Sequence, residues 1–396
     1  MREAAWKATL KACDTPAAPS ALLPVNARKL CSLFVLLACG AAPARAAAWD
    51  VVKVHGRDYV SFANVSEFYR FAEYNRARRT IALQSDRCGL RAEAGASEVY
   101  INGARFFTHF PLVEQGNAQL ISAFDVGKLL EPVLRPNRIP HLTKVETVVL
   151  DPGHGGADQG ATSKWGNEKK FTLEVAAAAR AQLLQAGFKV EMTRTGDTSR
   201  SLQERIDFAN QFSNAIFVSI HFNSGSGIGI ESFALAPEGA PSNVSLGEHH
   251  LAAPETAKND GNAQDSQNIA LAAAVHAAVL SRVTPYDRGI KHARFKVLRD
   301  LHLPAFLLEA GFLDDAAEGK RIATGSYRQQ LGTAIAEGIK SYNAATSYRR
   351  PSTTLSVVQA GDSPPAGNPI AQTSSGGEET GSAAAEALSP SLNAAK

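Results

Sequence analysis

Residues 145–156 read VETVVLDPGHGG, in which an apolar run passes directly into a glycine-rich turn. The run over 145–150 is typical of a strand buried on both faces, as in a parallel sheet. The turn places His154 at the carboxyl end of that strand, where open α/β sheets bind their ligands. Glycines beside it allow a tight turn and leave the imidazole unobstructed. His154 is therefore a candidate metal ligand, although a lone histidine on such a turn is more often structural.

The sequence around this motif alternates strand-like runs with helical patterns of ten or more residues, which is typical of βαβ units. This pattern predicts an α/β domain over residues 144–345. The expected strands are 145–150, 189–193, 215–220, 230–235, 295–298 and 305–308. The expected helices are 169–186, 202–209, 269–283 and a last one with Leu331, Ile335 and Ile339 on one face.

Upstream of this domain, residues 49–138 alternate short strand-like runs with turn signals, such as Asn-Gly at 102–103. One short amphipathic helix is expected over 65–72, so this part predicts a small α+β domain. The segment 121–134, with ISAFDV followed by LLEPVL, resembles the end of the small stalk-like domains related to the N-terminal domain of copper amine oxidases. Three prolines predict a linker to the α/β domain: Pro132, Pro136 and Pro140.

The first 46 residues show the order of features found in a secretory signal peptide. A basic pair at 28–29 precedes an apolar run over 30–42 that is too short to span a bilayer, and Ala-Arg-Ala follows at 44–46. We therefore expect residues 1–46 to be a leader, with export to the periplasm or cell envelope. Cys39 follows Leu-Leu-Ala and also fits a lipoprotein processing site. The membrane is an expected partner only if Cys39 carries lipid.

Composition excludes some classes of protein. Of the four cysteines, Cys13, Cys31 and Cys39 lie in or before the leader, so a mature chain that starts near Ala47 keeps Cys88 alone and has no internal disulfide. The formal net charge of +3 is too mild to indicate a nucleic-acid partner. Residues 346–396 are mainly Ser, Ala, Gly, Pro and Thr, and we expect this tail to be disordered because it cannot bury a core.

A second histidine occupies an equivalent position. The apolar run 215–220 leads directly into His221, so two strand ends each present an imidazole. Glu168 opens the helix that follows the first loop, which completes a set of two imidazoles and one carboxylate. This set is a known catalytic zinc arrangement with an open fourth position. Alternatively, Glu168 is a first-turn carboxylate favoured by the helix macrodipole.

One further acid, Glu309, follows the apolar run 304–308. A carboxylate beside a zinc site can take a proton from water and later deliver it to a leaving amine. Glu309 is therefore the candidate catalytic residue. The alternative is a buried ion pair between Glu309 and Arg288 or Lys291.

Together these fragments resemble a known family, the zinc-dependent N-acetylmuramoyl-L-alanine amidases of bacterial cell-wall remodelling. The resemblance covers residues 145–342 and is carried by VVLDPGHGG, NEKKFTLEVA, FKVEMTRTGD, SLQERIDFAN, FVSIHFNS, GIESFAL, RGIKHARFKVLRD and PAFLLEAGFL, in that order. It implies a twisted, mainly parallel sheet flanked by helices. It also implies one zinc ion on His154, Glu168 and His221, with Glu309 as general base and acid.

The resemblance implies peptidoglycan as partner and substrate. The bond cleaved would be the amide between the lactyl group of N-acetylmuramic acid and the L-alanine of the stem peptide. Two alternatives stay open, namely a zinc peptidase that acts on stem peptides and a non-catalytic peptidoglycan-binding regulator. Secondary candidates are Asn223 and Arg205 for substrate positioning or packing, Glu231 as a supporting carboxylate, and Asp151, which could orient His154.

A polar insertion over 236–266 departs from a simple α/β pattern. It contains Glu238, Glu248, His249, His250 and Glu255, where regulated members of the family carry a helix over the zinc cleft. Its Gly, Pro, Asn and Ala content favours a solvated loop. If it is instead a lid, a protein activator becomes a possible partner, and its deletion should raise basal activity.

Overall fold

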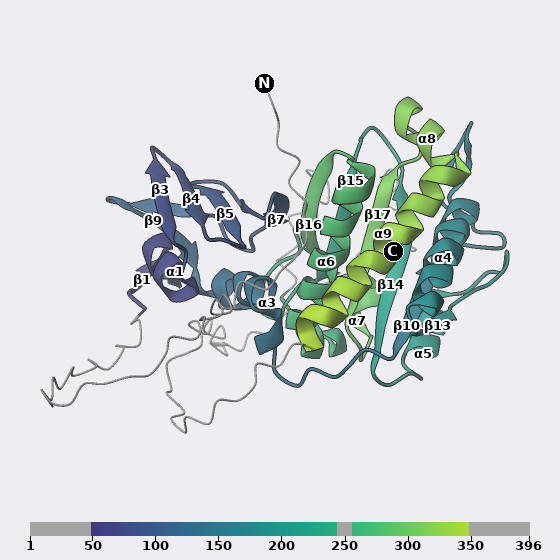
Figure 1. The fold of residues 1–396 in the computed structure, drawn as a ribbon, viewed down its shortest axis with the longest axis horizontal. Coiled ribbons are helices and arrows are strands. Elements are labelled where there is room, and N and C mark those ends of the chain that lie inside the picture. The colour runs from purple at the N-terminus through teal and green to yellow at the C-terminus, as the bar shows by residue number, and fades with distance from the viewer. Residues whose placement is uncertain (1–48, 244–255, 348–396) are drawn as a thin grey trace, which may run out of the picture.

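The computed structural model describes residues 49–243 and 256–347, and its main feature is one eleven-stranded sheet (Figure 1). In spatial order the strands are β13 (Lys189–Met192), β10 (Thr147–Pro152), β14 (Ala215–Asn223), β17 (Ala305–Phe312), β15 (Ile230–Leu235), β16 (Asp287–Ala293), β7 (Ala104–Phe107), β6 (Glu98–Ile101), β5 (Gly89–Glu93), β4 (Thr80–Gln84) and β3 (Glu73–Ala77).

The half of the sheet that follows residue 144 is mainly parallel, as expected. β10 pairs in parallel with β13 and β14, and β14 pairs in parallel with β17. The carboxyl ends of these four strands therefore meet at one edge of the sheet. Only β15 runs against its neighbour β17, while β16 is parallel to β15.

Helices cover both faces of this half. α4 (Glu168–Gln185), α6 (Asp265–Val283) and α9 (Gly325–Ser347) lie in front of the sheet in Figure 1 and pack on one core with Val148, Val218 and Phe306. α5 (Leu202–Ala209) and α7 (Lys296–Arg299) pack on the opposite face against Val149 and Phe217. α8 (Ala316–Ile322) follows β17. The expected α/β architecture with flanking helices is confirmed.

One expected strand was wrong. Residues 295–298 begin the helical turn α7, and β16 is the strand that the pattern missed. Val297 and Leu298 are consecutive and both pack into the same cluster as Leu307. Consecutive side chains of a strand would point to opposite faces, whereas a helical turn buries both on one side. β16 contains Asp, Arg, Lys and His, which hid its apolar pattern.

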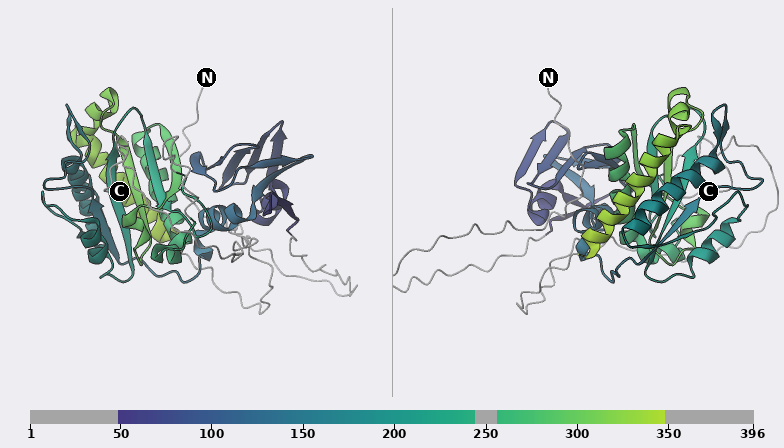
Figure 2. Two further views of the ribbon diagram at one scale, coloured as in Figure 1. Left: turned by 180° about the vertical axis from the view of Figure 1, so that it is seen from behind. Right: turned by 45° about the vertical axis from the view of Figure 1, so that its right-hand side comes forward.

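The small N-terminal α+β part expected before residue 138 is present, and its strands continue the main sheet (Figure 2). β16 pairs with β7 through Ile290 and Phe106, which joins the two parts edge to edge. A second sheet holds β1 (Val51–Val54), β2 (Arg57–Ser61), β9 (Ala118–Ser122) and β8 (Val113–Gln115). Its helices are α1 (Phe62–Tyr69), α2 (Ala123–Asp125), a π-helical turn (Val126–Leu130) and α3 (Glu131–Leu134).

The contact between the two parts is polar as well as apolar. Lys128 pairs with Asp265 over 2.9 Å, and the backbone N–H of Arg105 donates to Asp287 over 2.9 Å. The prolines expected to form a linker lie in α3, in a short 3-10 helix (Pro136–Arg138) and in a turn. The connection is therefore short and folded where an extended linker was expected.

The expected leader, including Cys39, lies outside the described residues, as does the tail after residue 347, so both stay predictions. Between residues 49 and 347, leaving out 244–255, none of the helices is both long and apolar enough to cross a bilayer.

Candidate metal centre

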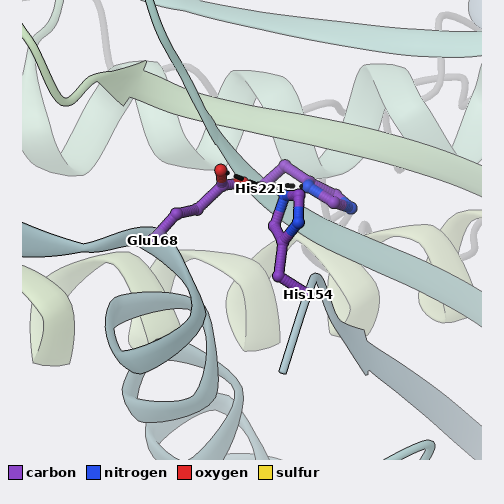
Figure 3. Close-up of side chains that lie close together, drawn as sticks. All are labelled: His154, Glu168 and His221. Atoms are coloured by element: carbon purple, nitrogen blue, oxygen red, sulfur yellow. Dashed lines mark hydrogen bonds and ion pairs between the residues drawn. The ribbon is translucent and has the colours of Figure 1, made fainter. Parts of the chain in front are cut away.

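Three side chains from separate elements converge at the carboxyl edge of the sheet: His154, Glu168 and His221 (Figure 3). His154 lies on the turn after β10, Glu168 begins α4, and His221 lies near the end of β14. One potential ligand atom from each residue lies within 4.8 Å of those of the other two. All three residues are at most 5% exposed. Such convergence of buried polar groups from distant segments needs a compensating interaction.

Glu168 connects the two histidines. His221 Nδ1 donates to Glu168 Oε1 over 2.9 Å, and His154 Nε2 lies 3.0 Å from Glu168 Oε2. The backbone N–H groups of Phe222 and Ala161 also donate to this carboxylate. Glu168 does open its helix, as the alternative interpretation required, but its carboxylate is directed at the imidazoles.

Glycines make this close approach possible. A Cβ added to Gly153 would lie 2.2 Å from the His221 ring, and one added to Gly160 would lie 2.5 Å from both His154 and Glu168. His154 itself has a left-handed backbone with φ of 61°, which costs a non-glycine residue roughly 1–2 kcal/mol. Strain of this kind persists where the surrounding structure enforces it, as functional sites do.

The turn is held in place by two buried arginines. Arg194 donates to the carbonyls of Pro152 and Gly153 over 3.0 and 2.7 Å, and Arg205 donates to the carbonyl of His154 over 2.8 Å. Burial lowers the pKa of Arg194 to about 10, and nearby Arg205 adds to this effect. The Arg194 guanidinium still remains charged at neutral pH.

The residues fit a metal ion by their chemistry. His154 Nδ1 donates to Asp158 Oδ2 over 2.8 Å, which leaves the Nε2 lone pair directed toward the other two residues. Metal-binding histidines usually donate their other ring N–H to a carboxylate in this way. Among the described residues, His154 Nε2 makes no hydrogen bond of acceptable geometry although it is buried. Two imidazoles and one carboxylate are also a common catalytic zinc set.

The electrostatics favour positive charge at this position. Burial alone would raise the pKa of Glu168, but its contacts with His154 and His221 hold that pKa well below its usual range. Burial alone would lower the pKa of His154, but Glu168 and Asp158 together raise it. A cation between these groups, whether a proton or a metal ion, is therefore stabilised.

Glu309 lies next to His221 across paired strands. His221 is opposite Glu309 in the parallel pair β14–β17, and Glu309 is opposite Glu231 in the antiparallel pair β17–β15. Directly opposite residues share a face of the sheet. These three side chains therefore form a row on the face that α5 and α7 cover. Glu309 is 1% exposed.

Arg288 and Lys291, the alternative ion-pair partners expected for Glu309, both pair with Glu231. Lys291 and Arg288 contact Glu231 Oε2 over 2.5 and 3.1 Å, and Asn223 donates to Glu231 Oε1 over 2.8 Å. Burial raises the pKa of Glu231, but Lys291 and Arg288 overcome this and lower it. Glu231 is therefore a structural carboxylate that pairs with Lys291 and Arg288 and accepts a hydrogen bond from Asn223.

Asp151 is linked to His154 through Arg205, which also donates to the His154 carbonyl, so a role of Asp151 in orienting His154 stays a prediction. Its carboxylate accepts from Thr193 and Ser219 over 2.6 and 2.8 Å and from Arg205 over 2.6 Å. The residue that contacts the His154 ring is Asp158, which the sequence interpretation missed. Its signal was an acid four residues after a histidine, inside the same glycine-rich turn.

Arg205 should be essential for stability because it neutralises a buried acid. Burial raises the pKa of Asp151, but Arg205 and Thr193 lower it below its usual range. Arg205→Met should reduce the free energy of unfolding by about 3–5 kcal/mol, since the Asp151 carboxylate would remain buried without its partner. Chemical denaturation followed by circular dichroism measures this loss.

The matched control is Arg180→Met, because Arg180 is exposed on α4. It should change stability by no more than about 0.5 kcal/mol. A loss below about 1 kcal/mol for Arg205→Met would contradict the proposed burial cost.

The insertion over 236–266 starts at the edge of the sheet opposite to these residues. β15 runs antiparallel to β17, so its last residue, Leu235, lies away from the edge that carries Glu309. Arg294 donates to the carbonyls of Pro237 and Ala240, which fixes the start of the insertion there. Residues 244–255 lie outside the described part of the chain. The described ends favour the loop alternative over the lid.

Comparison with known proteins places this site in a family. Residues 148–341 match a family model described as N-acetylmuramoyl-L-alanine amidase. The sporulation-specific N-acetylmuramoyl-L-alanine amidase of Bacillus subtilis (strain 168) is 34% identical over 195 residues, covering 49% of this chain and 66% of the relative. The amidase AmiA of Escherichia coli (strain K12) is 32% identical over 217 residues, covering 49% of this chain and 75% of AmiA. This chain belongs to the N-acetylmuramoyl-L-alanine amidase family.

A solved structure is also similar to this chain. The N-acetylmuramoyl-L-alanine amidase from Clostridium difficile 630 shares 32% sequence identity, covers 50% of this chain and 97% of its own, and has a TM-score of 0.41. The region that the family model matches, residues 148–341, contains His154, Glu168 and His221. The matches to the family model and to AmiA show that the protein is an amide hydrolase of the cell-wall amidase type, and peptidoglycan suits it as a substrate.

Proposed function

We propose that the amidase binds one zinc ion through His154, Glu168 and His221 and cleaves the amide between the lactyl group of N-acetylmuramic acid and the L-alanine of the stem peptide. The observation that carries this proposal is the convergence of one ligand atom from each residue within 4.8 Å. The family membership supports the choice of substrate. Asp158 supports the metal site because it fixes the His154 ring through Nδ1.

When bound, zinc would supply Lewis acidity, which polarises a carbonyl and lowers the pKa of water towards neutrality. Glu309 supplies the proton transfers. Its place opposite His221 in the strand register supports this role. It accepts a proton from the attacking water and then delivers one to the nitrogen of the leaving L-alanine. Its burial excludes bulk water as a competing proton acceptor.

Two alternatives use similar residues. A zinc peptidase would cut within the stem peptide, and a wall-binding regulator would hold the metal without hydrolysis. The matches to amidases over residues 148–341 favour the amidase. We also propose that the protein acts outside the cytoplasm, because its substrate lies there and one relative carries the name of a probable cell wall amidase.

Digestion of purified peptidoglycan tests the proposed reaction. The enzyme should release peptides that begin with a free L-alanine amine and leave the glycan strands intact. Chelation with EDTA should abolish this release, and one equivalent of Zn²⁺ should restore it. Mass spectrometry of the products identifies the bond.

Shortened stems with intact lactyl linkages would indicate the peptidase. Zinc in the purified protein without any hydrolysis would indicate the regulator. Release that persists fully after the metal has been removed would show that no metal is needed at this site.

A further inference from the structure

Two of the candidate ligands, His154 and Glu168, belong to segments whose spacing must be fixed before a metal ion can bind between them. His154 lies on the turn after β10 and Glu168 begins α4 (Figure 3), with the loop 155–167 between them. His154 Nε2 and Glu168 Oε2 lie 3.0 Å apart. His221, in contrast, lies within β14, which pairs with β10 and β17. The position of the turn relative to α4 therefore decides whether the three ligand atoms converge.

One buried side chain, Arg194, connects these two segments directly. It follows β13 and is 3% exposed. Its Nη2 donates to the carbonyl of Gly153 on the turn and to the carbonyl of Lys169 in the first turn of α4, each over 2.7 Å. Gly153 precedes His154 in the chain, and Lys169 follows Glu168. A single guanidinium nitrogen therefore joins the backbone next to one ligand to the backbone next to the other.

The remaining contacts of this guanidinium fix its orientation. Nε donates to the carbonyl of Pro152 and Nη1 to the carbonyl of Gly196, both over 3.0 Å. Arg194 Nη2 also donates to Thr172 Oγ1 over 3.1 Å, and this hydroxyl can donate in turn to the Gly153 carbonyl, 3.0 Å away. A planar fork of donors suits such a bridge, whereas a lysine ammonium on a flexible stem does not have this geometry.

The turn packs closely on this arginine. A Cβ added to Gly155 would lie 3.0 Å from Arg194 Cδ, 3.1 Å from Arg194 Nε and 2.2 Å from the carbonyl oxygen of Thr198. Gly155 also has a φ of 132°, which residues with a side chain rarely adopt. Glycine at this position therefore lets the turn lie directly on the Arg194 side chain.

The second arginine under the turn, Arg205, contacts a different set of groups. It donates to the carboxylate of Asp151 and to the carbonyls of Pro152 and His154. It also donates to the carbonyl of Arg200 over 3.2 Å. These acceptors belong to β10, to its turn and to the loop before α5, and none of them lies on α4. The link from the turn to α4 is thus made by the first arginine.

We propose that Arg194 is a positioning residue that sets the distance between His154 and Glu168 and thereby the affinity of the site for zinc. All of its hydrogen bonds described above are to groups of the protein, so the bridge exists before a metal ion binds. Its positive charge by itself opposes a second cation, so its contribution to metal binding is geometric. Groups that orient metal ligands typically contribute about 10- to 100-fold in affinity. This inference rests on the proposed function, because it takes zinc as the bound ion.

Zinc affinity of the full chain, measured against a competing chromophoric chelator, tests this role. Arg194→Lys keeps the charge but cannot span Gly153 and Lys169, so its zinc Kd should rise about 10-fold or more. Thr172→Val removes the supporting hydroxyl at nearly constant volume, and its zinc Kd should rise about 3-fold because a neutral hydrogen bond is lost. Peptidoglycan hydrolysis at limiting zinc should fall in both variants and should rise again as zinc is added.

The matched controls are Arg180→Lys, at an exposed arginine of α4, and Thr333→Val, at a threonine of α9 whose hydroxyl donates to the carbonyl of Gln329. Both should bind zinc with wild-type affinity. A lower melting temperature of zinc-free Arg194→Lys with an unchanged zinc Kd would overturn the inference, because a purely structural role predicts that result. If Arg194→Lys does not fold, a wild-type zinc Kd in Thr172→Val would overturn it by itself.

The same measurements separate this inference from the proposed function. A wild type that binds zinc but does not cleave the amide would refute the proposed reaction, while weaker zinc binding by the two variants would still support the positioning role. A wild type that binds no zinc would refute the proposed metal site and this inference together.

Discussion

Glu309→Gln should lower kcat by about 10³-fold, because glutamine keeps the shape of the side chain but cannot take a proton from water. The zinc content of the purified variant should equal that of the wild type, since Glu309 is not among the three converging residues. KM should change little, because the substitution removes a proton transfer and not a binding contact. Steady-state kinetics on a soluble muropeptide, with metal analysis of the same sample, measures both quantities.

A charge-matched control is Glu337→Gln. Glu337 lies on α9, remote in the chain from the site, and pairs with Arg282 at the surface. It should retain wild-type kinetics. If Glu309→Gln kept more than a tenth of the wild-type kcat, another group would have to serve as the base. The proposed catalytic role of Glu309 would then be wrong.

The second large effect is expected for His221→Ala, which should remove both zinc and activity. The variant loses one of three ligands, and kcat/KM should fall on the order of 10⁴-fold or more because water then keeps its high pKa. Metal analysis after dialysis should find little zinc, whereas the wild type should hold one ion per chain. Isothermal titration with Zn²⁺ measures the loss of affinity directly.

Folding must be checked for this variant, because His221 is buried and contacts Glu168. His221→Ala should melt near the temperature of the chelated wild type, since both lack the stabilisation that a bound metal gives. His302→Ala, at an exposed residue near Asp260, serves as the histidine control and should bind zinc normally. Full zinc occupancy in His221→Ala would falsify the assigned ligand set.

Much of the α/β half was predictable because its local patterns are strong. The run into LDPGHGG marked β10 and its turn, and the run into His221 marked β14, since strands buried on both faces are continuously apolar. β16 was missed for the opposite reason. Charged residues of β16 contact polar neighbours, as Lys291 contacts Glu231. The strand is therefore buried because of these partners, and its own composition does not reveal that burial.

Side-chain partnerships were harder to predict than candidate ligands. Asp151 precedes His154 closely, yet it faces Arg205 and Ser219, while Asp158 reaches the imidazole. From the sequence, Arg288 and Lys291 could have paired with Glu231 or with Glu309, and in the structure both contact Glu231. Such choices depend on strand register and on which face each residue occupies, and a one-residue shift in register reverses them.

Residue types and their local periodicity were thus sufficient to identify the strands that end in histidine, the helix that opens with Glu168, and Glu309 as an acid at a strand end. Local pattern acts over a few residues, because propensity and amphipathic spacing are short-range properties. The pairing of β14 with β17, the joining of β16 to β7 and the link from Arg194 to α4 came from contacts between segments far apart in the chain. These contacts exist only once the whole sheet has assembled, since strand order and register are set by packing across the complete core.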